Sequence, residues 1–322
     1  MKRRHLLSSA AALALLPRIA AAEGYPDRPV RFVVPYAPGG ATDTSARLAA
    51  ERLTELFGQQ VLVDNKPGGG TIIGTEVVAK AKPDGYTILL APGTIATNTA
   101  FGMKLPYDPA KDVVPVVDFV DMPLLLATNN DSPFKTMAEL IAWAKTQPGT
   151  VSFASPGNGS IPHLWAEQLG SQTGMKLEHI GYKGSADALK DVMGGHVKLF
   201  ADVLVPTGLQ VKAGRLRGLV VAASERSAML PDVPTIAEAG FPGLESAVFF
   251  GVMATGGTPP DVIARLNKAF NEVLAEPATR KKLLDLGFIL VGGSAEAYGE
   301  RIAKETVRWR KVIEDAHIPS PG

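Results

Sequence analysis

Two glycine-rich segments carry groups that could bind an anion, and the first of them joins a short apolar run to an amphipathic stretch. It reads Pro35-Tyr36-Ala37-Pro38-Gly39-Gly40-Ala41-Thr42-Asp43. Gly39 and Gly40 let the backbone approach a ligand closely, and a helix after such a turn offers unpaired N–H groups and a partial positive charge. Asp43 would repel an anion, so we expect it to cap the helix or to pin the turn by accepting backbone N–H bonds. An ordinary tight turn is the alternative interpretation.

The second segment, Ser155-Pro156-Gly157-Asn158-Gly159-Ser160, also leads from an apolar run into a helix start. Ser160 suits the N-cap, and Pro162 suits the first turn. The side chains of Ser160 and Asn158 can donate hydrogen bonds to a carboxylate. His163 follows in the same turn, so a Ser–His hydrolase is an alternative. Because the sequence offers no nucleophile elbow and no acidic third member there, we expect His163 to be structural or to orient the ligand.

Further candidate residues also follow predicted strands. Tyr182 could supply a phenol donor, and Lys183 a charge, although an exposed lysine in a turn explains Lys183 equally well. Thr94 has the same placement after an earlier strand, and Asp202 is one more candidate. The expected ligand-binding residues are Tyr36, Pro38, Gly39, Gly40, Asp43, Thr94, Ser155, Asn158, Gly159, Ser160, His163, Tyr182, Lys183 and Asp202.

Other site chemistries find no support in the sequence. The glycine triplet at residues 68–70 does not have the spacing of a dinucleotide-binding loop, and no phosphate-binding loop motif occurs. No two of His163, His179, His196 and His317 stand at helical metal spacing, and cysteine is absent. We therefore expect neither a metal nor a cofactor.

The elements that must position these residues alternate between apolar strands and amphipathic helices. Strands are expected at residues 30–34, 61–63, 86–91, 151–154, 177–180, 197–201 and 216–222. Helices are expected from about Asp43 to Phe57, from Pro259 onward, and from Tyr298 to Val312. A short helix is also expected where Thr235 and Glu238 form a capping box. This order predicts an α/β protein with a mainly parallel sheet, in which ligands bind at the carboxyl ends of the strands.

Length and charge restrict the class of protein further. A chain of 322 residues suggests two domains. A net charge of +1, from 33 Lys and Arg against 32 Asp and Glu, gives no broad field to attract nucleic acid. The first residues combine a basic start, an apolar run from Leu6 to Leu16 and a small-residue site at Ala20-Ala21-Ala22, which predicts a secretory signal peptide over residues 1–22. We expect a periplasmic protein that is cleaved near Ala22 and, lacking cysteine, is not a lipoprotein.

A series of motifs along the mature chain resembles one known family. They are residues 35–43, 64–68, 83–87, 155–164, 182–184, Arg226 with 230–235, 238–240 and 258–259. In this order they resemble the tripartite tricarboxylate transporter receptors, also called the Bug or TctC family of periplasmic solute receptors.

This resemblance implies a type II periplasmic-binding-protein fold, with two domains and a cleft between them. The chain would cross between domains near Met122 and Val248, which gives residues 23–122 and 248–322 to domain 1 and residues 123–247 to domain 2. A carboxylate would be held by the turns at residues 36–43, 155–160 and 182–184, with His163. Backbone amides, hydroxyls and waters would do much of this work, rather than an arginine clamp.

The resemblance also implies a function without catalysis. The protein would capture a small carboxylate for the membrane subunits of a transporter, and we expect it to be a monomer. An adaptor for a sensor kinase is the alternative, and the Ser160–His163 hydrolase ranks below both. Lys198 and the Phe249-Phe250-Gly251 segment depart from the family pattern, which leaves the far end of the ligand, and so its identity, open.

Overall fold

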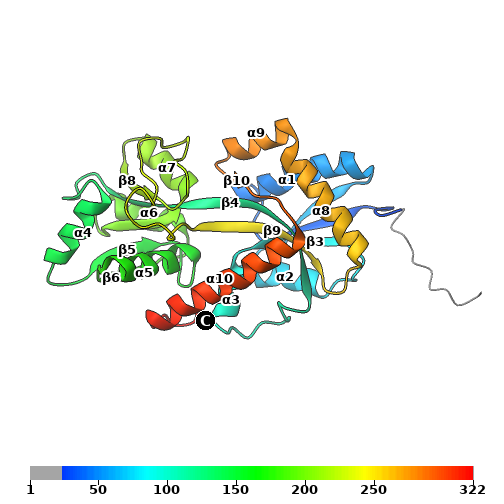
Figure 1. Ribbon diagram of the computed structural model, residues 1–322, viewed down its shortest axis with the longest axis horizontal. Coiled ribbons are helices and arrows are strands. Elements are labelled where there is room, and N and C mark those ends of the chain that lie inside the picture. Colours follow the sequence, from blue (N-terminus) through cyan, green and yellow to red (C-terminus); the bar gives the residue numbers. More distant parts are fainter. Residues whose placement is uncertain (1–23, 322) are drawn as a thin grey trace, which may run out of the picture.

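The computed structural model describes residues 24–321, so the predicted signal peptide lies outside the described residues. Two α/β lobes lie side by side, and two strands run from one lobe into the other (Figure 1). The lobe at the right of Figure 1 contains β1 (Val30–Val34), α1 (Ala41–Phe57), β2 (Val61–Asn65), η1 (Gly69–Thr71), α2 (Ile72–Ala79), β3 (Thr87–Pro92), α8 (Pro260–Ala275), α9 (Pro277–Asp285) and β10 (Ile289–Leu290). The lobe at the left contains α4 (Met137–Thr146), β5 (Val151–Ser155), α5 (Ile161–Thr173), β6 (Leu177–Gly181), α6 (Ser185–Met193), β7 (Leu199–Val203), α7 (Leu204–Lys212) and β8 (Leu216–Val221). The elements at the junction are α3 (Thr94–Ala100), β4 (Val113–Asn129), β9 (Ala247–Thr255) and α10 (Ala295–Asp315).

The strands of both lobes form one hydrogen-bonded sheet in the order β2-β1-β3-β9-β4-β7-β5-β6, with β8 and β10 each paired to β4. β1 is parallel to β2 and β3, and β5 is parallel to β6 and β7, as the alternating sequence pattern predicts. β4 and β9 run antiparallel to each other and to their other neighbours. The carboxyl ends of the parallel strands therefore lead into the candidate turns in each lobe.

β4 is a strand that the sequence analysis did not predict, although it joins the two halves of the molecule. Residues 113–123 pair with β9, and residues 124–129 pair with β7 and β8. Pro115 and Pro123 interrupt its apolar run, and proline normally argues against a central strand. Register shifts in the pairing with β9 accommodate Pro115, and Pro123 lies where β4 exchanges one set of partners for the next.

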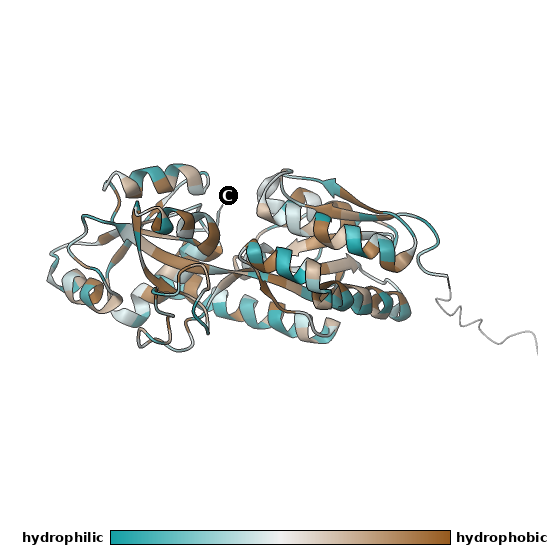
Figure 2. Cartoon of the chain, turned by 90° about the horizontal axis from the view of Figure 1, so that it is seen from above, coloured by the Kyte–Doolittle hydropathy of each residue, from teal (hydrophilic) through white to brown (hydrophobic). Residues whose placement is uncertain are grey.

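Aromatic packing fixes the right-hand lobe behind its first turn. The ring of Phe270 in α8 lies edge-on to Phe32 in β1 and to Phe119 in β4, with centroids 5.7 Å apart in each pair. Leu53 of α1 and Leu266 of α8 point into the core and are fully buried. In Figure 2 the strands are mostly brown and the outward helix faces mostly teal, which is the distribution expected of an apolar interior.

Two local predictions need correction. Thr235 and Glu238 form the reciprocal hydrogen bonds of a capping box, at 2.8 and 3.1 Å, but the segment is a turn rather than a helix. Gly240 has a φ of 96°, which ends the turn too early for a helix to form. α8 begins one residue later than predicted, at Pro260, because the Thr258 hydroxyl donates to the carbonyl of Thr255 instead of capping the helix.

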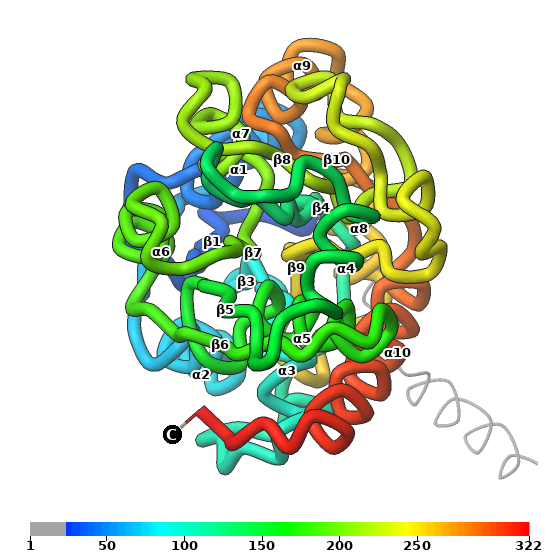
Figure 3. The backbone as a smooth tube through the Cα atoms, turned by 90° about the vertical axis from the view of Figure 1, so that its left-hand side faces the viewer, coloured from blue at the N-terminus to red at the C-terminus, as the bar shows by residue number. Residues whose placement is uncertain are grey.

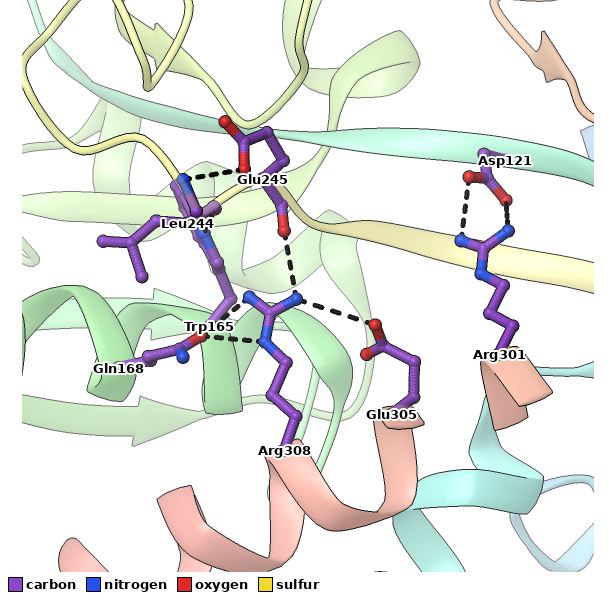
Figure 4. A network of polar contacts seen from close by, with 9 residues as sticks. Asp121, Trp165, Gln168, Leu244, Glu245, Arg301, Glu305 and Arg308 are labelled. Atoms are coloured by element: carbon purple, nitrogen blue, oxygen red, sulfur yellow. Dashed lines mark hydrogen bonds and ion pairs between the residues drawn. The ribbon is translucent and has the colours of Figure 1, made fainter. Parts of the chain in front are cut away.

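α10 braces the junction from the side of the sheet that lies opposite α6 (Figure 3). Arg301 donates to both carboxylate oxygens of Asp121 at 2.8 Å and to Asp118 at 2.7 Å, both in β4. Two turns further on, Arg308 donates to the Gln168 side chain of α5 and to the Glu245 carbonyl (Figure 4). One helix thus holds the crossing strand with one arginine and the left-hand lobe with the other.

The ion pair of Arg301 is mostly buried, which makes its loss costly. Burial raises the pKa of Asp118 to about 6 even though Arg301 opposes this effect. We expect Arg301→Met to lower the free energy of unfolding by about 3–5 kcal/mol at pH 7, because two buried carboxylates would lose their cation. Urea denaturation would measure this change.

Lys281 supplies the matched control, since its exposed ammonium group pairs with Asp285 at 2.6 Å within one helix. Lys281→Met should change the free energy of unfolding by less than about 0.5 kcal/mol. Equal losses in the two variants would contradict a buried brace.

Candidate functional site

The first predicted turn ends in a helix start without a side-chain cap. Gly40 is the N-cap of α1, and no side chain accepts a hydrogen bond from the first turn. Gly39 has a φ of 94°, a conformation that favours glycine. The side chains of Pro38 and its neighbours are exposed. The unpaired N–H groups at the start of this 17-residue helix therefore remain available to an anion.

Of the two roles predicted for Asp43, the structure shows one: its carboxylate pins the turn and does not cap α1. Its Oδ2 accepts the N–H of Gly39 at 2.9 Å, and its Oδ1 accepts from the side chain of Asn65 at 2.8 Å. Asn65 also donates to the carbonyl of Tyr36, and Arg47 donates to Asp43 at 2.9 Å. Burial alone would raise the pKa of Asp43, but the hydrogen bonds from these donors outweigh it and hold the pKa below its ordinary value. The carboxylate is ionised and fixes the shape of the turn.

Tyr36 and Thr94 lie on neighbouring strand ends of the same lobe. The Tyr36 ring is packed edge-on to Phe250 of β9 at 6.0 Å, and burial raises the pKa of its hydroxyl. The Thr94 hydroxyl shares a hydrogen bond of 2.7 Å with that of Thr71. Gly93, just before Thr94, leaves no room for a side chain: a Cβ there would lie 2.7 Å from the Phe249 ring and 3.0 Å from Ile161. The turn after β3 therefore meets the start of α5 from the other lobe.

The second predicted turn is largely satisfied by its own hydrogen bonds. Ser160 is the N-cap of α5, as predicted, and its Oγ accepts the N–H of His163 at 3.3 Å. The N–H of Gly159 donates to Nδ1 of His163 at 3.0 Å, and the N–H of Ser160 donates to the carbonyl of Gly157. The Asn158 side chain is exposed and has no hydrogen-bond partner between residues 24 and 321. Within the described residues, the donors left for a ligand are the side chains of Asn158 and Ser160 and the N–H groups of Asn158 and Ile161.

His163 is buried under this turn and does not face the Ser160 hydroxyl as a base would. Its side chain is 3% exposed, its Nδ1 is occupied by Gly159, and its Nε2 lies 3.7 Å from Glu167. The ring of His179 in β6 stacks on it with a centroid distance of 3.6 Å. In this geometry His163 is not placed to act as a general base for the Ser160 hydroxyl.

His179 is a residue whose role the sequence analysis missed. Its Nε2 lies 2.7 Å from the Oγ of Ser155, at the carboxyl end of β5. Burial and the neighbouring His163 lower the pKa of His179 to about 3, so its ring is neutral near pH 7. No spacing signal could reveal this contact, because 24 residues separate His179 from Ser155 and the pairing of β5 with β6 decides it.

The third turn is hydrogen-bonded to the second. The N–H of Tyr182 donates to the carbonyl of Ser155, and that of Gly184 donates to Pro156. The Tyr182 phenol, which we considered as a ligand donor, donates to Asp191 at 2.6 Å, and burial together with Asp191 raises its pKa to about 12. Lys183 is exposed and forms no ion pair within the described part of the chain. Gly184 is the N-cap of α6 and, like Gly40, leaves the helix without a side-chain cap.

Asp202 lies at the carboxyl end of β7, beside the second and third turns in the sheet order. It is 2% exposed, and its Oδ1 accepts the N–H of Val203 at 2.7 Å. Its Oδ2 is buried without a hydrogen-bond partner in the region from Gly24 to Pro321. Burial raises the pKa of Asp202 to about 6, although the Ser185 hydroxyl and the Val203 amide act against this.

The described residues contain neither a cluster suited to a metal ion nor a membrane-spanning helix. No group of three or more His, Asp or Glu side chains between residues 24 and 321 could hold a metal ion. In the same range, no helix combines the length and the apolar character needed to cross a membrane.

Comparison with known proteins identifies close relatives. A model of the tripartite tricarboxylate transporter family receptor matches residues 45–318. BugT of Bordetella pertussis is 37% identical over 296 residues, 91% of each chain. A UPF0065 protein from the gbd 5′ region of Cupriavidus necator is 34% identical over 97% of each chain.

Solved structures give the same result. Rpa4515 of R. palustris, solved with adipate, is 36% identical with a TM-score of 0.79 over 92% of this chain and 99% of its own. MatC of Rhodopseudomonas palustris, solved with malate, is 32% identical with a TM-score of 0.74 over 90% of this chain and 100% of its own. A sulfonate-binding protein of Methylobacillus flagellatus, 14% identical, shares the fold alone with a TM-score of 0.53. The predicted α/β fold of a type II periplasmic-binding protein is confirmed.

The buried carboxylate of Asp202 yields a test of the site's electrostatics. A pKa raised from 3.8 to about 6 means that the group contributes stability below pH 4 and loses that contribution as the pH rises through 6. Relative to wild type, Asp202→Asn should therefore gain up to about 3 kcal/mol in free energy of unfolding between pH 4 and pH 7. Urea denaturation at several pH values would measure the difference, and a constant difference would contradict this assignment.

Proposed function

The chain belongs to the tripartite tricarboxylate transporter receptor family, and from this premise we propose that it is a receptor that captures a small organic carboxylate between its two lobes without converting it. The observation that carries the proposal is a pair of helix starts, one in each lobe. α1 and α6 both begin after a glycine N-cap, and neither has a side-chain cap. Both follow the carboxyl end of a parallel strand, where α/β sheets bind ligands. Their unpaired N–H groups can bind a carboxylate without an arginine.

The similar structures support the ligand class. Rpa4515 was solved with adipate and MatC with malate, and both compounds are dicarboxylates. A dicarboxylate has an anionic group for each lobe, so only the closed form would offer all the contacts, and binding would favour closure. The residues proposed to line the site are those predicted from the sequence, with Tyr182 and His163 acting through the turns that they hold. Asn158 and Ser160 supply side-chain donors.

The division into domains follows from the same proposal. Residues 23–122 and 248–322 would form one domain, and residues 123–247 the other. In support, β4 changes its strand partners after Pro123, and Pro123 is paired with Ala247 at the start of β9. Closure would then bend the chain at these two neighbouring crossings.

The cellular setting completes the proposal. The protein would act in the periplasm as a monomer after cleavage near Ala22, and its closed form would dock on the membrane subunits of a transporter. A sensor kinase is the alternative partner for the closed form.

Isothermal titration calorimetry against a panel of carboxylates would test the proposed function. The panel should include adipate, malate, succinate, citrate, an amino acid and an aromatic acid, with neutral diols as controls. At least one carboxylate should bind with a dissociation constant in the micromolar range or below, and chromatography should recover it unchanged. Conversion of the ligand, or no binding across the whole panel, would contradict the proposal.

The pinned first turn provides a prediction for the same assay. We expect Asp43→Ala to weaken carboxylate binding about tenfold or more, because the turn would lose the hydrogen bonds to Gly39 and Asn65 that fix it. Asp261 lies in the first turn of α8 and is exposed, so Asp261→Ala is the matched control and should leave affinity unchanged. Similar affinities in the two variants would show that the turn does not depend on Asp43.

A further inference from the structure

Beneath the second turn, two stacked imidazole rings connect strand β6 to the turn itself. His163 and His179 come from different elements, and their rings are tilted by only 14° at a centroid distance of 3.6 Å. Phe153 of β5 packs beside both rings, with centroids 6.0 Å from His163 and 4.9 Å from His179. The three rings form a layer directly behind the backbone of residues 155–160.

The hydrogen bonds of the turn fix the proton position of His163 and tie Ser155 to His179. His163 Nδ1 accepts the N–H of Gly159, so the proton of this neutral ring is on Nε2, on the side of Glu167. Ser155 Oγ lies 3.1 Å from the Gly157 carbonyl, to which it donates, and accepts the N–H of Gly157 at 3.3 Å. Ser155 Oγ also lies 2.7 Å from His179 Nε2, and the tautomer of His179 decides which of these two atoms donates.

We propose that His179 is a positioning residue of the carboxylate site, because its hydrogen bond with Ser155 fixes the turn that presents Asn158 and Ser160. The amides of Gly157 and Gly159 flank Asn158 in the chain, and both point inward, to Ser155 and to His163. With these two amides held, Asn158 is the residue that projects outward, and its side chain is exposed. The inference rests on the proposed function, since it assigns a role within the same site.

The neutral state of His179 suits this role. Its ring is half-buried beside Phe153 and His163, and burial lowers the pKa of His179 to about 3. A charged imidazole would bring a cation into the stack, whereas a neutral ring forms the hydrogen bond with Ser155 and packs against the other two rings. The stack therefore acts through geometry, without adding charge to the site.

Substitutions at His179 and Ser155 separate positioning from general stability. His179→Phe keeps an aromatic ring in the stack but removes the hydrogen-bonding nitrogen, and His179→Gln restores a side-chain amide that can donate to or accept from Ser155. The probes are adipate and malate, titrated calorimetrically, and thermal unfolding is recorded for each variant. His196→Phe is the matched control, because His196 is exposed on the turn after α6.

The expected results follow from the single hydrogen bond at issue. His179→Phe should weaken binding of the better probe about tenfold, with an unfolding midpoint close to wild type, and His179→Gln should recover most of the affinity. Ser155→Ala should cause a similar loss, and the double variant His179→Phe with Ser155→Ala should bind no worse than Ser155→Ala alone. His196→Phe should bind as wild type does.

Three results would overturn the inference while leaving the proposed function intact. They are unchanged binding by His179→Phe, additive losses in the double variant, or a loss of affinity that parallels a loss of stability and is not rescued by glutamine. If His179→Phe does not fold, His179→Gln and Ser155→Ala still decide the question, because the former should bind about as wild type does and the latter should not. If wild type binds no carboxylate of the full panel, the proposed function itself fails.

Discussion

One strand, β4, belongs to both lobes, and the arrangement of the molecule depends on it. Its first part is paired with β9 and its last part with β7 and β8, so the parallel strands of each lobe are fixed relative to one hydrogen-bonded ladder. The turns after those strands consequently start from defined positions in both lobes. Helix α10, which packs against the junction, contacts β4 through Arg301 and the left-hand lobe through Arg308. A ligand bound between the turns would act on the lobes through these few crossings.

The three helix starts at the proposed site offer an anion different kinds of hydrogen-bond donor. At α1 and α6, glycine N-caps leave the first N–H groups unpaired, and an anion can take them. At α5, Ser160 and His163 use most of the available N–H groups, so that turn offers side-chain donors instead. Asp43 and His179 play similar parts behind these surfaces. Asp43 is buried and His179 half-buried, each contacts the backbone or the hydroxyl of a turn, and each would act on the site through the shape of that turn.

Much of the fold could be predicted because the parallel strands are short apolar runs separated by turn residues. The strands at residues 30–34 and 151–155 and the helices that follow them lie where periodicity predicts them. β4 could not be found in this way, since Pro115 and Pro123 disrupt its apolar pattern and only pairing with distant strands makes it continuous. The capping box at Thr235 predicted the correct hydrogen bonds but the wrong element, because Gly240 ends the segment within one turn.

The sequence by itself determined the local features of this protein. Glycine at residues 39, 40, 157 and 159 and Ser160 as a cap follow from requirements that act within a few residues, whereas the sequence left Asp43 open between capping the helix and pinning the turn. Only the tertiary structure decided which side chains meet across longer distances, such as His179 with Ser155, Asn65 with Asp43 and Tyr182 with Asp191. It also decided which way the polar side chains of the turns point. The Tyr182 phenol contacts Asp191, and the two ring nitrogens of His163 face Gly159 and Glu167. The physical reason is that strand register and side-chain packing set these contacts, and neither is encoded in the spacing of the residues that they join.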